Sequence, residues 1–476
     1  MKHFTYRTLS ELQQETEKLG LEHVRFEEDP ERIRSVLARP VPVGSFLAGN
    51  SIAIHPMEGC DGTTDGRPGE LTYRRYERFG RGGAKLIWFE ATAVRGAARA
   101  NTRQLWLNED TVGDLARLLE TALTAHREVY GNADDVLAPL QLTHSGRYSV
   151  PRRIIADHNP VLDAKTNVPA DYPVISDDEL ERLEDDYVDA AKLALKAGYR
   201  AIDLKVTHGY LLNELLGAKL RDGRYGGSLE NRTRFIRNVF GKIRAALGSQ
   251  MMLAMRLGCY EGVPYQRDPS SGVGVPLPYP IPYPHGLGND ESDPLREDLT
   301  EVKQAIAWFR DWGLQLLNVS MGCPYFNPHV GRPFEKPDEG NYDAPEHQLY
   351  GVERHFRIAG ELQRTFPELP MVGTGYSWLQ IYAIHAAARN IADGNIRFYG
   401  AGRNALAYPD FARDALDRGA LQERQVCKTV TFCTYLMRQK NHPLGQYPTG
   451  CPPFDKEVYG QIIKEARLVQ RAAPNK

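Results

Sequence analysis

Eight short apolar runs, each followed by a longer amphipathic segment, constrain the fold of this chain more than any other feature. Nearly continuous apolar runs are typical of strands buried on both faces, as in a parallel sheet covered by helices. The runs cover residues 51–56, 85–91, 136–143, 201–207, 251–258, 314–320, 370–375 and 396–402. The pattern therefore predicts eight parallel strands that alternate with helices.

The segments between the runs have the residue spacing of amphipathic helices. Ser176 and Glu179 form a capping-box pattern, which predicts a helix start. Apolar side chains then recur at the spacing of one helix face. They are Leu180, Leu183, Tyr187, Ala190, Ala191 and Ala194. Segments 302–313, 350–366 and 378–390 also predict helices.

Strand–helix units in this number are typical of a (β/α)8 TIM barrel, an α/β fold. A doubly wound sheet is the alternative. It usually has a glycine-rich G-x-G-x-x-G turn after its first strand, and no apolar run here is followed by one. We therefore predict a TIM barrel over residues 45–420, a mostly helical N-terminal extension over 1–44 and a helical C-terminal tail over 421–476.

Residues 260–294, after the fifth run, break this alternation. The segment is rich in tyrosine and glycine, and its closely spaced prolines exclude a helix. Loops of this length are usually lids, binding loops or disordered segments, and barrel active sites lie beyond the carboxyl ends of the strands. Because disordered tracts contain few aromatic residues, we predict a lid over the site. A flexible insertion is the alternative.

Charge and hydropathy exclude several classes of partner. The chain of 476 residues has 59 basic and 61 acidic side chains, a balance that does not indicate nucleic-acid binding. No apolar run approaches the roughly 20 residues that span a membrane, and charges interrupt residues 1–20, where a signal peptide needs an apolar stretch. Six cysteines in so long a chain do not form a disulfide framework. We therefore expect a cytoplasmic protein that acts on a small molecule; a homo-oligomer is compatible with these features.

Polar side chains follow the predicted strands, where the loops of a barrel form its active site. The candidates are His55 to Cys60, Glu90, Gln141, His144, Lys205 to Tyr210, Arg256, Asn318, Gly373 to Gly375, and Gly402 with Arg403. The last two turns contain glycines, which let backbone N–H groups approach an anion. Since the loops after strands seven and eight form the usual phosphate site of this barrel, we expect a phosphate-bearing ligand. Tight turns without a ligand are the alternative.

Several of these stretches resemble the Old Yellow Enzyme family of FMN-dependent NADH:flavin oxidoreductases. The matching stretches are HPMEGCDGT (55–63), QLTHSGRYSVP (141–151), HGYLLNELLGAKLRDGRYGGSLENRTRF (208–235), MRLG (255–258) and GAGRNALAYPDFARDAL (400–416). The third stretch is the most specific. The resemblance implies a TIM barrel with bound FMN, NADH or NADPH as the hydride donor, and reduction of an activated C=C bond, as in ene-reductases.

The resemblance also implies which residues bind the cofactor. Pro56 and Met57 match a pair whose backbone touches the flavin. The flavin-tuning position that follows usually holds Thr or Cys but here is Glu58, with Cys60 as the alternative. Gln141 and Arg256 match residues at the pyrimidine edge of the flavin. The residues that match the phosphate-binding turns are Gly373, Thr374, Gly375, Gly402 and Arg403.

The implied catalytic residues lie in the fourth strand and the turn after it. Lys205 and His208 match two hydrogen-bond donors that hold the substrate's oxygen, and Tyr210 matches the proton donor. Such donors stabilise the charge that hydride transfer leaves on a carbonyl oxygen, and a tyrosine hydroxyl can then protonate the α-carbon. Lys205 replaces the more common histidine, and its charge suits an enolate or a carboxylate-bearing substrate. A surface ion pair is the alternative role for Lys205.

The tail contains Cys427, Cys433 and Cys451, which incompletely resemble the iron–sulfur pattern C-x2-C-x2–3-C-x11-C of multidomain relatives. Val430 stands where the second cysteine is expected, and the spacing to Cys451 is too long. Because such clusters normally have four cysteine ligands, we predict no metal site. The tail is also too short for a dinucleotide-binding domain, so a nicotinamide would have to use the same flavin face as the substrate.

Three alternatives to an ene-reductase stay open on the sequence. The first is an FMN-dependent amine dehydrogenase or demethylase that passes electrons to an external acceptor. The second is a flavin-free barrel lyase or aldolase with Lys205 as a Schiff-base lysine. The third is a flavin-holding redox partner without small-molecule turnover.

Overall fold

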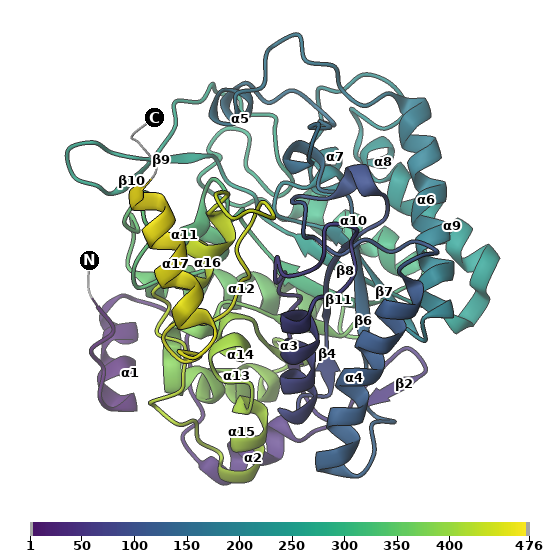
Figure 1. Cartoon of the computed structure of the whole chain (residues 1–476). Helices are drawn as coiled ribbons and strands as arrows, with labels where there is room; N and C mark the ends of the chain where they lie inside the picture. The colour runs from purple at the N-terminus through teal and green to yellow at the C-terminus, as the bar shows by residue number, and fades with distance from the viewer. Residues whose placement is uncertain (1–2, 473–476) are drawn as a thin grey trace.

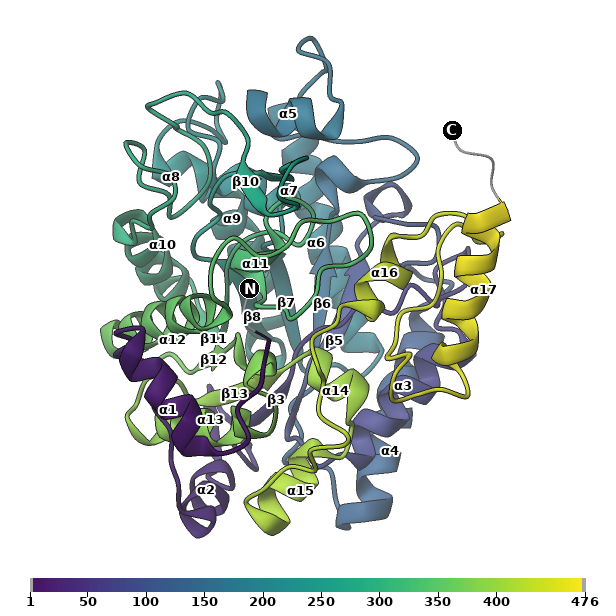
Figure 2. The same ribbon diagram turned by 90° about the vertical axis from the view of Figure 1, so that its left-hand side faces the viewer.

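A ring of parallel strands forms the centre of the molecule (Figures 1 and 2). The computed structural model describes residues 3–472. The strands are β3 (Ile52–Ile54), β4 (Leu86–Ile87), β5 (Phe89–Ala93), β6 (Pro139–Thr143), β7 (Ala201–Val206), β8 (Met252–Gly258), β11 (Leu314–Ser320), β12 (Met371–Gly373) and β13 (Phe398–Ala401). Every apolar run of the sequence contains one of them, which confirms the predicted strands.

The ring closes through the second barrel strand, which Trp88 divides into β4 and β5. On one side β4 pairs with β3, and on the other β5 pairs with β6. All pairs around the ring are parallel. The Trp88 backbone N–H also donates to the Ile54 carbonyl (3.1 Å). The fold is therefore the predicted (β/α)8 TIM barrel and not a doubly wound sheet.

Helices cover the outside of the ring. The larger ones are α3 (Glu70–Arg81), α4 (Val112–Tyr130), α6 (Asp177–Lys196), α9 (Arg234–Leu247), α10 (Thr300–Asp311), α12 (Gln348–Thr365), α13 (Ala383–Ala392) and α15 (Phe411–Arg418). Helix α6 starts at the predicted capping box, in which the Ser176 and Glu179 side chains bond to each other's backbone N–H groups. The apolar side chains predicted for its inner face are all buried. Short helical pieces occupy the loops: η1 (Gly96–Ala98), η2 (Gly146–Tyr148), α7 (Leu211–Leu216), α8 (Leu229–Arg232), η3 (Gly248–Gln250) and α11 (Pro328–Gly331).

The helix predicted over 378–390 is correct only in its second part. Residues Tyr376–Tyr382 form the 3-10 segment η4, and the α-helix begins at Ala383. Gln380 has φ 53°, which breaks helical geometry between the two segments. The chain thereby turns beside the expected phosphate site before α13 starts.

The N-terminal extension begins with two helices, α1 (Leu9–Lys18) and α2 (Pro30–Leu37), as predicted. It ends in an antiparallel hairpin of β1 (Val41–Val43) and β2 (Phe46–Ala48), which the sequence analysis did not predict. The hairpin buries alternate side chains against inward-facing barrel residues, including Trp88 and Phe398. It therefore caps the interior of the barrel opposite the carboxyl ends of the strands. Residues 1–2 of the predicted extension lie outside the described part.

Residues 260–294 form a loop with a small hairpin of β9 (Tyr265–Arg267) and β10 (Gly274–Pro276). The loop packs on helix α5 (Pro160–Thr166): Val161 is buried with Val263 and Tyr283. Asn159, at the start of α5, donates a hydrogen bond to the Tyr283 hydroxyl (2.8 Å). The aromatic residues of the segment therefore anchor it to the body of the protein.

The tail returns to the carboxyl ends of the strands. After α14 (Arg403–Ala407) and α15, helices α16 (Phe432–Arg438) and α17 (Tyr459–Ala472) lie beside α3 in both ribbon views. Arg74 and Arg78 of α3 each donate to the Asp455 carboxylate at 2.7 Å. Residues 473–476 of the predicted tail lie outside the described part. Between residues 3 and 472, no helix has the length and apolarity needed to cross a membrane.

Candidate active site

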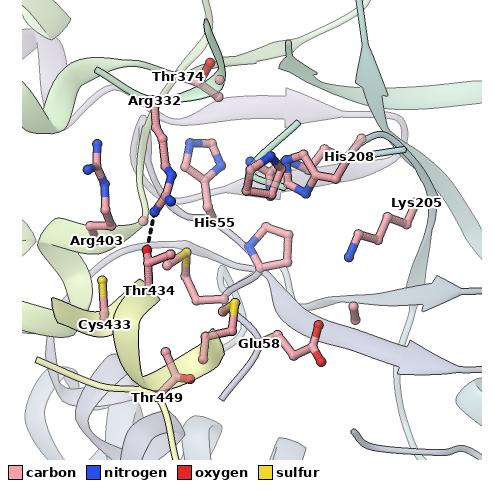
Figure 3. Close-up of a pocket in the computed structure, with 18 of the residues that line it drawn as sticks. His55, Glu58, Lys205, His208, Arg332, Thr374, Arg403, Cys433, Thr434 and Thr449 are labelled. Atoms are coloured by element: carbon pink, nitrogen blue, oxygen red, sulfur yellow. Dashed lines mark hydrogen bonds between the residues drawn. The ribbon is translucent and has the colours of Figure 1, made fainter. Parts of the chain in front are cut away.

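A cavity at the carboxyl ends of the barrel strands collects most of the predicted site residues (Figure 3). Those that line it are Pro56, Met57, Glu58, Gln141, Lys205, His208, Tyr210, Arg256, Thr374, Gly375, Gly402 and Arg403. In Figure 3 the Lys205 and His208 side chains enter from the right, and those of Arg332 and Arg403 from the left. Lys205 is only 6% exposed and lines this cavity, so a surface ion pair is the wrong interpretation of this residue.

Cys60 and Gly373 are the predicted cofactor residues that do not line the cavity. Cys60 is buried behind Glu58, and its Sγ lies 3.7 Å from Asn101 Nδ2. Asn101 donates to Glu58 Oε1 as well (2.7 Å), which fixes the carboxyl group. Of the two candidates for the flavin-tuning position, Glu58 is the one that faces the cavity. Gly373 packs instead against Ile396, which would lie 2.9 Å from an added Cβ.

Asp203 organises the floor of the cavity from strand β7. Its carboxylate accepts a hydrogen bond from the Trp88 indole (2.9 Å), from the Arg256 backbone N–H (2.6 Å) and from the Gln141 amide. Burial raises the pKa of Asp203 to about 6, against the effect of these three donors. With its N–H group bonded to Asp203, the Gln141 amide is held with its oxygen free to accept. The sequence analysis did not assign Asp203 to the site, because an acidic residue inside a predicted strand gives no sign of this role.

Arg256 lies half-buried at the floor, and no carboxylate between residues 3 and 472 forms an ion pair with it. Burial lowers the pKa of its guanidinium to about 10, and its Nε atom has no hydrogen-bond acceptor. His55 Nε2 and His355 Nε2 are also buried and unpaired. Buried polar groups are costly unless a partner satisfies them. A ligand with a polar, electron-rich edge, such as the pyrimidine ring of a flavin, fits these donors.

The turns after β12 and β13 form a narrow cradle at the opposite end. Gly375 has φ 91°, a conformation that favours glycine. A Cβ on Gly400 would lie 2.3 Å from the His55 ring, and one on Gly402 would lie 2.9 Å from Met57 Sδ. Thr374 and His355 are hydrogen-bonded at 2.8 Å. Since only a glycine backbone fits so close to the cavity wall, the cradle suits the phosphate group that the sequence predicts.

The predicted catalytic edge, residues Lys205 to Tyr210, depends on a sharp turn at the end of β7. His208 has φ 65° and Gly209 φ 68°, so two successive residues adopt left-handed geometry. The turn is held by the Gly209 N–H, which donates to Asn213 Oδ1 (2.8 Å), and by the Cys323 thiol, which donates to the His208 carbonyl (3.1 Å). A non-glycine residue in this region is strained and is often found at functional sites. The turn directs Lys205, His208 and Tyr210 into one cavity.

Burial sets the charge of the donors at this edge. It lowers the pKa of Lys205 to about 8, although the Glu58 carboxylate opposes the shift. Burial, together with the charges of Arg256 and Lys205, keeps the pKa of His208 well below its usual value. At neutral pH the edge therefore presents an ammonium group beside a neutral imidazole. Burial also raises the pKa of Tyr210 well above its usual value, so its hydroxyl stays protonated.

Tyr210 belongs to an aromatic group above the floor. The Lys205 ammonium lies 3.7 Å from the centre of the Tyr210 ring. The Tyr210 hydroxyl is hydrogen-bonded to the Tyr325 hydroxyl (3.2 Å), and the Tyr325 ring lies 4.2 Å from that of Tyr148. Tyr210 is 1% exposed, whereas Tyr325 is half-buried. The Tyr325 hydroxyl therefore connects the buried hydroxyl to the outer part of the cavity.

Two segments line the cavity that the sequence analysis did not assign to it. One follows β11 and contributes Pro324, Tyr325, Gly331 and Arg332; the other is the tail, with Cys433, Thr434, Met437, Arg438 and Thr449. The place of the first segment after the sixth strand was a usable signal. The tail residues carry no such signal, because their approach depends on tertiary packing.

The predicted lid, residues 260–294, provides no residue of the cavity wall. It instead supports the segment after β11. Asn327 donates to the carbonyls of Glu261 (2.6 Å) and Val263 (3.1 Å), and the Tyr265 N–H donates to the Phe326 carbonyl (2.8 Å). The prediction that the loop itself covers the site is therefore wrong: its apolar residues are buried against α5, and the loop lies behind the lining segment.

The three cysteines of the tail differ in burial and in their place relative to the cavity. Cys427 is buried, and Cys433 and Cys451 are half-buried. Cys433 alone lines the cavity. Among residues 3–472, no group of three or more His, Cys, Asp or Glu side chains is arranged to hold a metal ion.

Comparison with known proteins agrees with this geometry. Residues 37–270 match the family model described as the NADH:flavin oxidoreductase / NADH oxidase family. An NADPH dehydrogenase of Geobacillus sp. (strain WCH70) is 29% identical over 267 residues, which are 51% of this chain and 75% of that protein.

Two solved structures share the barrel fold. The Old Yellow Enzyme homologue from Zymomonas mobilis has a TM-score of 0.57 at 21% identity, and the match covers 83% of this chain and 96% of that one. Histamine dehydrogenase from Rhizobium sp. 4-9 has a TM-score of 0.58 at 20% identity. That match covers 81% of this chain but only 48% of the dehydrogenase.

The family match, the barrel and the unpaired donors of its cavity lead to the same assignment. They confirm the predicted enzyme class and the cofactors, FMN with NADH or NADPH. Over residues 37–270 the chain is similar to the NADH:flavin oxidoreductase / NADH oxidase family, and it shares its barrel fold with an Old Yellow Enzyme homologue.

Proposed function

We propose that the protein takes hydride from NADH or NADPH and reduces an activated C=C bond of a small molecule. The observation that carries this proposal is the catalytic edge: an ammonium group, a neutral imidazole and a protonated phenol converge on one cavity from a single strand and turn. When bound, FMN supplies the hydride chemistry. All other steps are assigned to side chains of this chain.

Lys205 and His208 hold the oxygen of the substrate that gains negative charge. The Lys205 ammonium and the His208 ring both line the cavity, close to the positive charge of Arg256, and both can donate to the oxygen there. Fixed donors in such a site stabilise developing charge more strongly than water does. The charge of Lys205 also favours a substrate with a carboxylate close to the double bond.

Tyr210 holds the proton that the substrate's α-carbon receives. Its high pKa keeps the hydroxyl protonated until carbanion character develops next to it. The hydrogen bond from Tyr325 stabilises the phenolate that remains, and Tyr325 can return a proton from the more exposed part of the cavity. The residues thus provide both the oxygen site and the acid that an ene-reductase needs.

The same charges separate this function from the amine-oxidising alternative. A cationic amine would have to enter beside the Lys205 ammonium and the unpaired Arg256 guanidinium, and like charges in a site of low polarity repel strongly. Glu58 is the one observation in favour of an amine, since its carboxyl group faces the cavity. We therefore keep amine dehydrogenase as the second candidate, for which Glu58 would bind the cation.

A half-reaction experiment tests the proposal. The FMN-loaded protein is reduced anaerobically with NADH or NADPH, and then mixed with an enone, with an enoate, or with a buffer blank. Recovery of the flavin's visible absorbance with the unsaturated compounds supports the proposal. Reduction by an amine but not by either nicotinamide would support the second candidate instead, and a nicotinamide-reduced protein that no small acceptor reoxidises would support a redox partner.

A further inference from the structure

Two arginines at the cradle end of the cavity have no carboxylate partner anywhere between residues 3 and 472. They are Arg332, from the segment after β11, and Arg403, from the turn after β13; both line the cavity on the same side (Figure 3). Arg403 donates one hydrogen bond to the Pro333 carbonyl (2.8 Å), and Arg332 donates one to the Thr434 hydroxyl. Nε and one terminal nitrogen of Arg332, and one terminal nitrogen of Arg403, are buried without an acceptor.

The charge at this end of the cavity is unbalanced. Arg438 is also close, but the Asp338 carboxylate neutralises it. Burial, with the charges of Arg403 and Arg438, lowers the pKa of the Arg332 guanidinium to about 10. Uncompensated charges of one sign are costly in a site that excludes water. Two adjacent guanidinium groups with free donors are therefore arranged for an anion.

We propose that Arg332 and Arg403 together clamp the phosphate group of FMN, with the backbone of Thr374, Gly375 and Gly402 completing the site. The sequence resemblance assigned only Arg403 and the two turns to this phosphate. A phosphate dianion can accept paired hydrogen bonds from two guanidinium forks, which suits arginine better than lysine. The inference rests on the FMN cofactor of the proposed function.

The clamp also connects the cofactor to the rest of the site. Arg332 lies seven positions after Tyr325 on the same segment, and Asn327 fixes that segment by accepting from the Cys323 N–H (2.6 Å). Through Thr434, Arg332 contacts helix α16 of the tail. A phosphate held by Arg332 would therefore stabilise both the segment that carries Tyr325 and the tail that closes this end of the cavity.

Binding of FMN and of riboflavin to the deflavinated protein tests the clamp, because the two ligands differ only in the phosphate. The variants are Arg332→Met, Arg332→Lys and, as a matched control, Arg397→Met. Arg397 precedes β13 at the opposite end of the barrel, and its side chain donates to the Pro367 carbonyl (3.2 Å). Flavin fluorescence quenching gives Kd, and the change in Tm with added inorganic phosphate is measured on the same proteins.

Arg332→Met should weaken FMN binding by on the order of 10- to 100-fold, as expected for the loss of charge-assisted hydrogen bonds. Riboflavin binding should not change, Arg332→Lys should recover part of the FMN affinity, and the control should behave as wild type. Inorganic phosphate should raise the Tm of wild type but not of Arg332→Met.

An equal loss for FMN and riboflavin, or unchanged FMN binding, would overturn the clamp. A wild-type protein that binds no FMN would refute the proposed function, and if phosphate also failed to stabilise it the clamp would be refuted as well.

Discussion

Replacing Lys205 by methionine removes the ammonium group but keeps a side chain of similar length in the cavity. The pKa of Lys205 is about 8, so roughly nine in ten molecules carry the charge at pH 7 and about one in ten at pH 9. Raising the pH removes the charged donor. The rate at which an enone reoxidises the reduced protein should therefore fall about tenfold between these two pH values in the wild type.

In Lys205→Met the same rate should be lower at neutral pH by on the order of 10²–10³, the usual cost of losing one such donor. The decrease between pH 7 and 9 should also disappear. Stopped-flow absorbance measures the reoxidation across this range, and Lys192→Met, at an exposed lysine of α6, is the control. Other titratable groups also surround the Lys205 ammonium. They are Glu58, Asp203, Arg256 and His208. If the variant kept the wild-type decrease with pH, one of them would be responsible and the role of Lys205 would be refuted.

Three further substitutions test other parts of the account. Tyr210→Phe should slow reoxidation by an enone by roughly 10²–10⁴, as expected for loss of the acid, but should leave reduction by NAD(P)H nearly intact; equal slowing of both half-reactions would contradict the assignment. Tyr325→Phe should slow reoxidation by only about three- to tenfold, the value of one neutral hydrogen bond, and should have little further effect in the Tyr210→Phe background. Gly400→Ala places a Cβ 2.3 Å from the His55 ring and should lower the free energy of unfolding by about 1–3 kcal/mol in urea titrations; an unchanged midpoint would show that the cradle has room to relax.

The sequence predicted the barrel because buried parallel strands leave a strong local pattern. The eight apolar runs and the capping box at Ser176 depend on residues close together in the chain, and the structure has both. Positions at strand ends were equally predictable, since the carboxyl end of every strand reaches the same face of a barrel. For this reason Lys205, Gln141 and Arg256 were found without any knowledge of their contacts.

The remaining features depend on contacts between distant parts of the chain. Thr434 and Arg438 reach the cavity only because the tail packs back on α3, and no local pattern records that path. Asp203 was missed because an acidic residue within an apolar run gives no sign of which neighbours it bonds. The segment 260–294 was misjudged for the opposite reason: its composition indicated a binding loop, but composition does not say which surface its aromatic residues cover.

The most direct test of the central claim is a double-mixing experiment on the FMN-loaded wild-type protein without oxygen. The first mix adds NADH or NADPH, and the second adds an enone or a carboxylate-bearing enoate. We predict that one of the nicotinamides removes the flavin's visible absorbance, that the unsaturated compound restores it, and that the saturated product forms in equal amount. Absorbance that returns only with an electron carrier and never with an activated C=C compound would contradict the account.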